Sequence, residues 1–376
     1  MMMLSTIALA AGLVADGSVR VEGRGGTTEG GQDPRSIGVS GDLHGRASDA
    51  DGALRFGLEP SVVLAQGSQL FVRGFGAAEL RLRKDAWVRV RQALGYGSID
   101  LSPLAPAAAR VPIQPPPGSG FLSVQESNTS LELDVTATRR LRIAGSASWV
   151  VAGGANADAR ATFPLSRGPL LHASSDWSAT RLDTLRLQLE AFDYRYSNDR
   201  RASVASLAAG WRTLLARGTQ LSTSLGAGIG RSRSEDKTAA TVVYAVGGAD
   251  LRSTPWRNVS ASVGALVEPL GDPLSGDLIE RGSVRVAAVW DRHRMVALSA
   301  RVMGSVALTS GSGSPTSPQA GDRYLEGELS ATVPLDARSS VAAGIRAAHL
   351  SRPILDQPST QWVAFASYVG QLPLIR

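Results

Sequence analysis

The chain contains no cysteine among its 376 residues. This absence excludes a disulfide scaffold, a metal site built from thiolates and a lipid-modified N-terminal cysteine. Long apolar runs are also missing, because none approaches the roughly 20 residues that a membrane-spanning helix requires. The sequence therefore excludes a helical membrane transporter, and strands remain as the means by which it could cross a membrane.

Histidine is scarce, with four in the whole chain. One of them, His172, shares a predicted strand face with Ser174 and Asp176. Side chains at successive same-face positions of one strand stand parallel, so these three groups do not converge on a substrate as a catalytic triad must. We expect no enzymatic activity, no metal centre and no cofactor.

The charge balance is basic, with 39 Lys and Arg against 33 Asp and Glu. Most of the positive charge is arginine, which recurs singly on predicted strand faces and in turns. Proteins that bind nucleic acid usually gather their basic residues in blocks or on one patch. We therefore expect no nucleic-acid partner.

A two-residue period marks residues 70–96 as a β-hairpin. Even positions such as Leu82 and Val88 are aliphatic, whereas odd positions such as Arg81 and Arg89 are charged. Because the parity is the same on both strands, we expect a three-residue turn that sets Leu82 opposite Val88 and Arg81 opposite Arg89. Such a ribbon needs an apolar surrounding on one face and water on the other, as in a soluble sheet or in a membrane barrel.

The same alternation recurs from residue 54 to the C-terminus, in segments of about ten to fourteen residues, the length of a tilted bilayer-spanning strand. Short turns alternate with longer connections, which is typical of an outer-membrane barrel with its short turns in the periplasm. We count about 16 strands, or 18 if two early alternating pieces form an extra hairpin. The expected fold is all-β: a single closed antiparallel transmembrane β-barrel in the bacterial outer membrane.

Four regions follow from this interpretation. Residues 1–15 have the apolar middle and small-residue sites of a signal peptide, although they lack a basic start. Residues 16–53 are a lead-in or an extra hairpin, residues 54–372 are the barrel, and residues 373–376 are a C-terminal tail.

The polar parity of the strands is rich in Ser, Gly and Thr, which cannot fill a wide interior, so we expect a hydrated lumen. Charged residues punctuate this face, and their arginine excess favours anionic solutes. Equally, they could be solvated or paired charges without selectivity. The candidate lumen-lining residues are Arg73, Glu79, Arg81, Arg89, Arg91, Arg142, Arg186, Glu190, Arg212, Arg285, Arg301, Glu326 and Glu328.

Tryptophans on the apolar parity indicate an interfacial girdle of the kind that membrane barrels carry. Trp177, Trp211 and Trp290 lie near predicted short turns, and Trp149 and Trp362 mark the opposite rim. One aromatic run breaks the pattern, because residues 192, 194 and 196 fall on the polar parity of their strand. This run predicts either a bulge or rings that face the lumen.

The segment Leu58-Glu59-Pro60-Ser61-Val62, followed by a strand and closely spaced hairpins, resembles the porin-like barrels encoded beside exopolysaccharide export systems. This resemblance implies an outer-membrane protein whose partners are outer-membrane lipid, the barrel insertion machinery and periplasmic polysaccharide-export proteins. One departure concerns the C-terminus. Such barrels usually end on an aromatic residue that the insertion machinery reads, whereas this chain continues to Arg376 after its last aromatic, Tyr368.

The function we expect is an outer-membrane channel that passes polar or anionic solutes, as a component of exopolysaccharide secretion. Residues 103–120, which contain three consecutive prolines, are the candidate gate of this channel. Two alternatives remain: a non-conducting barrel that serves as a platform for envelope or surface partners, and a soluble all-β binding protein. Conductance separates the first from the channel, and extraction without detergent would identify the second.

Overall fold

The structure is a computed structural model, which describes residues 13–28, 35–48, 52–64, 68–100, 121–234, 237–272, 276–292, 295–309, 320–351 and 359–375. These residues form 18 antiparallel strands in one sheet and one short helix. The strands are β1 Leu13–Thr28, β2 Arg35–Ser48, β3 Gly52–Leu64, β4 Ser68–Arg83, β5 Ala86–Asp100, β6 Phe121–Thr136, β7 Leu141–Gly154, β8 Ser166–Ser178, β9 Asp183–Tyr196, β10 Arg201–Ala216, β11 Thr219–Ser234, β12 Lys237–Trp256, β13 Val259–Gly271, β14 Leu278–Arg292, β15 Val296–Ala307, β16 Arg323–Pro334, β17 Ser339–Ser351 and β18 Ser359–Ile375. The helix is α2, Ala157–Thr162.

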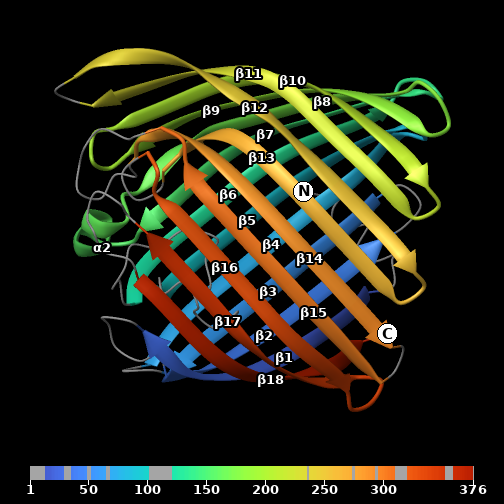
Figure 1. The fold of residues 1–376 in the computed structure, drawn as a ribbon, viewed down its shortest axis with the longest axis vertical. Helices are drawn as coiled ribbons and strands as arrows, with labels where there is room; N and C mark the ends of the chain where they lie inside the picture. Colours follow the sequence, from blue (N-terminus) through green and yellow to red (C-terminus); the bar gives the residue numbers. More distant parts are fainter. Residues whose placement is uncertain are drawn as a thin grey trace.

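Each strand pairs with its neighbours in sequence, and β1 pairs with β18, so the sheet closes on itself (Figure 1). A closed barrel leaves no sheet edge, which is the condition for strands to cross a membrane. The expected barrel class is confirmed. No helix of the described residues is long and apolar enough to span a bilayer.

The count of about 16 strands is wrong, and the alternative of 18 holds, because residues 16–53 contribute an additional hairpin. The alternating strand pattern of this hairpin is weak in the sequence, because β1 and β2 are rich in Gly, Ser and Asp. Closure of the barrel imposes the strand geometry on them, with β1 held between β2 and β18. β1 begins at Leu13, inside the expected signal peptide, and β18 continues to Ile375, inside the expected tail.

The two ends of the barrel differ in their connections. At one end lie the short turns, such as residues 84–85, 217–218 and 257–258, together with the start of β1 and the end of β18. At the other end lies α2, in the connection between β7 and β8 (Figure 1). Because short turns face the periplasm in outer-membrane barrels, we refer to these as the periplasmic and extracellular ends.

The hairpin of β4 and β5 keeps the expected faces but not the expected register. Leu80 lies opposite Val88, and Glu79 lies opposite Arg89, so the pairing is two residues from the predicted one. The turn contains only Lys84 and Asp85, and an irregularity between residues 81 and 83 preserves the parity. A bulge adds one residue to one strand. A bulge with a two-residue turn therefore preserves the parity here, in place of the predicted three-residue turn.

The aliphatic side chains of the strands are exposed all around the molecule, for example Leu131 and Leu133 on β6 and Leu187 on β9. A folded soluble protein rarely leaves such a large apolar surface open to water. This surface is the outer wall of the barrel, and it matches the hydrocarbon of a bilayer.

The described pairing of β12 with β13 covers only part of β12. Among the described pairings, β12 bonds to β13 only from Gly247 toward the periplasmic end, while its first part bonds to β11. The backbone N–H of Ala245 donates instead to the side chain of Glu280, at 2.8 Å.

Candidate functional site

The inner face of the barrel is hollowed and polar. A cavity of 510 Å³ is bordered by β9 to β15, with Arg186, Arg212, Asp250 and Arg285 among its lining residues. A second cavity, of 430 Å³, lies against β4 to β8 and is lined by residues that include Glu79, Arg89, Arg142 and His172. Barrels of 16 to 18 strands are wide enough to leave an aqueous channel, and these cavities are parts of that lumen.

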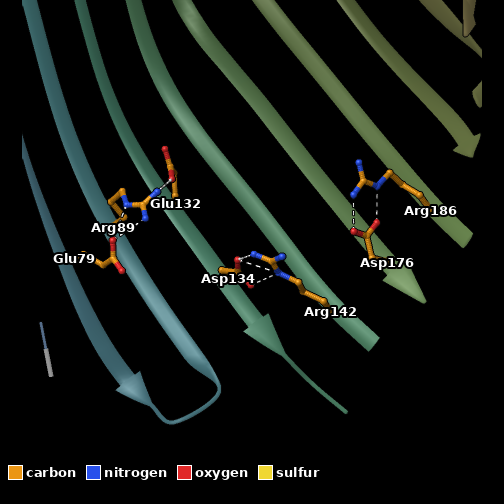
Figure 2. A network of polar contacts seen from close by, with 7 residues as sticks. All are labelled: Glu79, Arg89, Glu132, Asp134, Arg142, Asp176 and Arg186. Atoms are coloured by element: carbon orange, nitrogen blue, oxygen red, sulfur yellow. Dashed lines mark hydrogen bonds and ion pairs between the residues drawn. The ribbon is translucent and has the colours of Figure 1, made fainter. Parts of the chain in front are cut away.

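Arginines and acids alternate across neighbouring strands on the inner face (Figure 2). Arg89 on β5 donates to Glu79 on β4 at 2.7 Å and to Glu132 on β6 at 3.1 Å. Arg186 on β9 binds both carboxylate oxygens of Asp176 on β8, at 2.5 and 2.6 Å. These contacts arise because the register sets Glu79 opposite Arg89, Arg89 opposite Glu132, and Asp176 opposite Arg186.

The same arrangement continues along the wall. Arg142 on β7 reaches both oxygens of Asp134 on β6. Asp250 on β12 accepts from Arg252 at 2.7 Å and from Arg285 on β14 at 2.8 Å. We call these alternating charges the lumen ladder; its members are Glu79, Arg89, Glu132, Asp134, Arg142, Asp176, Arg186, Asp250, Arg252 and Arg285. Half-exposed ion pairs contribute about 0–1 kcal/mol each, so the ladder matters more for the charge of the wall than for stability.

A second charged network lies near the closure of the barrel. Arg301 on β15 donates to Glu326 at 3.2 Å and to Glu328 at 3.0 Å, both on β16. Arg346 on β17 donates to Glu328 at 2.8 Å and to Glu22 on β1 at 2.8 Å. The Glu22–Arg346 pair is almost fully buried, with 2% and 6% of the side chains exposed.

The remaining candidate residues lie on the same face with other contacts. Arg73 pairs with Glu126. Arg81 lies over the ring of Trp87, 5.5 Å from its centroid, and Arg91 lies over that of Phe75, at 5.4 Å. Glu190 lies opposite His172 on one neighbouring strand and Ser206 on the other. Arg212 lines the larger cavity.

Sequence reasoning missed several acids that bind these arginines. Asp134 and Asp176 share the polar parity of their strands, so the face of each could be predicted, but their partners depend on the register between strands. The face of Asp250 could not be predicted, because both parities are apolar over residues 241–251. Glu22 and Arg346 were missed because residues 16–53 were predicted as either a lead-in or an extra hairpin, so no partner strand could be assigned to β1.

The aromatic run that breaks the pattern faces the lumen near the extracellular end. Phe192, Tyr196 and Tyr244 form a buried cluster with Val204 and Leu278. Gly276, two residues before β14, lies against the ring of Tyr196, and the adjacent Asp277 forms an ion pair with Arg200 at 2.5 Å. Of the two alternatives, a bulge or rings that face the lumen, the structure shows the lumen-facing rings.

The candidate girdle residues lie on the outer wall. Trp149, Trp177, Trp211 and Trp362 are between 42% and 54% exposed, and Trp290 is less so. Trp256, which was not among the candidates, ends β12 and is 67% exposed.

Two further groups bear on chemistry. His172, Ser174 and Asp176 stand in a row on β8, and the Asp176 carboxylate is engaged by Arg186. On β2 and β3, Asp42, His44 and Glu59 bring ligand atoms within 4.8 Å of one another, a grouping that sequence reasoning did not anticipate. The Pro-rich candidate gate, residues 103–120, lies outside the described residues.

Comparison with known proteins supports both the resemblance to porin-like barrels and the resemblance to exopolysaccharide-export proteins. Residues 87–245 match the family model "EpsX exopolysaccharide export family". The fold resembles OpdO of Pseudomonas aeruginosa, with a TM-score of 0.53 and 11% identity over 96% of this chain and 98% of that one. No curated protein sequence matches significantly.

Two other solved structures share the fold. OccK2 (OpdF) of Pseudomonas aeruginosa, solved in complex with glucuronate, has a TM-score of 0.52 and 12% identity over 96% of this chain and 98% of that one. The FrpB iron transporter from Neisseria meningitidis has a TM-score of 0.56 and 9% identity, and the match covers 92% of this chain and 65% of the FrpB chain. The chain thus has the fold of outer-membrane porins, and its residues 87–245 match the EpsX exopolysaccharide export family.

Proposed function

We propose that this protein is a passive outer-membrane channel for polar or anionic solutes and that it serves exopolysaccharide secretion. The observation that carries the proposal is the closed 18-strand barrel with an aliphatic outer wall and a hollowed inner face that bears the lumen ladder. The match of residues 87–245 to an exopolysaccharide export family supports the choice of solute.

Selectivity in such a channel comes from the arginines that the acids of the wall do not neutralise. Arg91 stacks on an aromatic ring, and Arg212 lines the larger cavity; among the described residues, neither forms an ion pair with an acid. Their charge is therefore available to solutes in the lumen. A wall of this kind raises the local concentration of anions and lowers that of cations.

The test is conductance in planar bilayers. The purified protein should form open channels, and an anionic polyuronate should block the current more often than a neutral dextran of the same length. Arg91→Glu combined with Arg212→Glu should remove this preference. Arg217→Glu combined with Arg257→Glu changes the charge equally in the periplasmic turns and serves as the control. A protein that folds and inserts but never conducts would instead support the platform alternative.

The partners implied by this function are proposals too. Outer-membrane lipid would cover the outer wall, and the barrel insertion machinery would act on the closing strand β18. Periplasmic polysaccharide-export proteins would meet the periplasmic turns, which are exposed and basic at Arg139, Arg140, Arg217 and Arg257.

A further inference from the structure

Four arginines stand in one row across the outer wall at the extracellular end. Arg167 on β8 lies directly opposite Arg195 on β9, Arg195 lies opposite Arg201 on β10, and Arg201 lies opposite Arg233 on β11. All four are exposed. We call Arg167, Arg195, Arg201 and Arg233 the arginine row.

The row faces away from the lumen. Strands β8 to β11 direct their even-numbered side chains inward, as Asp176, Arg186 and Arg212 show, so the odd-numbered arginines are on the outer face. Each arginine lies within two residues of the extracellular end of its strand. The row is therefore at the boundary between the outer leaflet and the exterior.

Like charges directly opposite one another on a sheet destabilise it, and this row contains three such contacts in succession. One acid offsets it in part: Asp193 accepts from Arg201 at 2.7 and 2.5 Å. Among the described residues, no acid forms an ion pair with Arg167, Arg195 or Arg233. Arg231, opposite Ser203 in the next row, adds a fifth exposed positive charge to the same face. An anion from outside the chain would relieve this repulsion.

Directly below the charges the wall turns aliphatic. Leu171 on β8, Ile229 on β11 and Val243 on β12 are 45%, 59% and 71% exposed on the outer face. A ligand that fits both layers has an anionic head above and hydrocarbon below. Guanidinium groups bind phosphate oxygens in pairs of parallel hydrogen bonds, and neighbouring strands about 4.8 Å apart let adjacent arginines share one phosphate.

We propose that the arginine row binds the phosphorylated headgroup of an outer-leaflet lipid, with the acyl chains lying on the aliphatic layer below it. This site is on the opposite side of the wall from the solute path. It would anchor the barrel at β8 to β11 without contact with the lumen ladder.

The test measures lipid binding to the purified full-length barrel by native mass spectrometry. The probes are bisphosphorylated lipid A, lipid A without its phosphates, inorganic phosphate and an acidic polysaccharide. The variant is Arg167→Gln, Arg195→Gln and Arg233→Gln combined. Its matched control is Arg181→Gln, Arg217→Gln and Arg257→Gln, which removes the same charge from the periplasmic turns. Heat-modifiable gel mobility establishes that every variant is folded.

Wild type and control should bind bisphosphorylated lipid A equally, and the variant should bind it about tenfold or more weakly, since it lacks three arginines that form charge-assisted hydrogen bonds to the phosphates. Lipid without phosphates should bind weakly to all three proteins. Equal binding of bisphosphorylated lipid A by variant and control would overturn the proposal. So would binding of the phosphate-free lipid as tight as that of lipid A, displacement by millimolar inorganic phosphate, or tighter binding of the acidic polysaccharide.

Discussion

Glu22 on the first strand binds Arg346 on the seventeenth, at 2.8 Å, across the strand that closes the barrel. The two residues are 324 positions apart in the sequence. The guanidinium of Arg346 also lies over the ring of Phe365 on β18, 4.0 Å from its centroid. One buried contact thus joins β1, β18 and β17, the three strands whose association converts a sheet into a barrel.

Removing one partner of this pair should weaken the closure strongly. Arg346→Leu leaves the buried carboxylate of Glu22 without its ion-pair partner, which costs about 3–5 kcal/mol. Glu22→Gln should cost less, because Arg346 keeps its ion pair with Glu328 at 2.8 Å. The double variant should lose less than the sum of the two. Urea unfolding in lipid vesicles measures the difference.

Glu79→Gln is the control, because its half-exposed partner Arg89 keeps access to water and to Glu132. It should cost at most about 1 kcal/mol. If Arg346→Leu destabilises the barrel no more than Glu79→Gln does, the closure does not depend on this pair.

Parity alone was sufficient to predict which side of most strands faces lipid. A two-residue period fixes the face of a side chain without any knowledge of its neighbours, so Leu131 and Glu132 could be assigned to opposite sides from the sequence. The Glu22–Arg346 contact could not be predicted, because it depends on which distant strands meet when the sheet closes.

Register was the second limit. A bulge near Arg83 and a three-residue turn preserve parity equally well, yet they differ by two residues in pairing. The predicted opposition of Arg81 and Arg89 was therefore wrong, whereas their common face was right. Phe192 and Tyr196 could not be placed from parity alone, since their burial depends on Tyr244 and Leu278 of more distant strands and on Gly276.

Neutralising acids of the lumen ladder should increase anion selectivity. Glu79→Gln, Asp134→Asn and Asp176→Asn combined leave Arg89, Arg142 and Arg186 without their main partners. The chloride-to-potassium permeability ratio should rise at least about twofold, because counter-ion concentration follows the potential of the wall. Reversal potentials across a salt gradient measure this ratio.

The matched control removes the same charge outside the lumen, by Asp85→Asn, Asp158→Asn and Asp199→Asn in turns and in α2. This control should leave the reversal potential unchanged. An equal shift in both proteins would mean that net charge, rather than the ladder, sets selectivity.

The aromatic cluster at the mouth should limit conductance. Tyr196→Ala removes a buried ring of this lumen-facing cluster, at a cost of about 3 kcal/mol to stability. The lumen should then be wider at this end, and single-channel conductance should rise. Tyr96→Ala, at a 66% exposed tyrosine of the outer wall, is the control and should change neither the stability nor the single-channel conductance. A Tyr196→Ala channel of unchanged conductance would show that the narrowest point lies elsewhere.

The outer tryptophans should contact lipid, and Trp87 should not. Trp87 faces the lumen beside Arg81, whereas Trp362 is 54% exposed on the outer wall. In proteins that keep a single tryptophan, brominated lipid should quench the fluorescence of Trp362 and spare that of Trp87, and aqueous iodide should do the reverse. Quenching of both by brominated lipid would place Trp87 on the wrong side of the wall.

The absence of cysteine makes the central claim directly measurable, because each introduced thiol is the only one in the chain. Leu131, Glu132, Leu133 and Asp134 of β6 are each replaced by cysteine, and the folded protein in lipid vesicles is treated with a charged, membrane-impermeant thiol reagent. Positions 132 and 134, which face the water-filled lumen, should be labelled, and positions 131 and 133, which face lipid, should be protected. Labelling of all four at similar rates, or of 131 and 133 alone, would contradict the account.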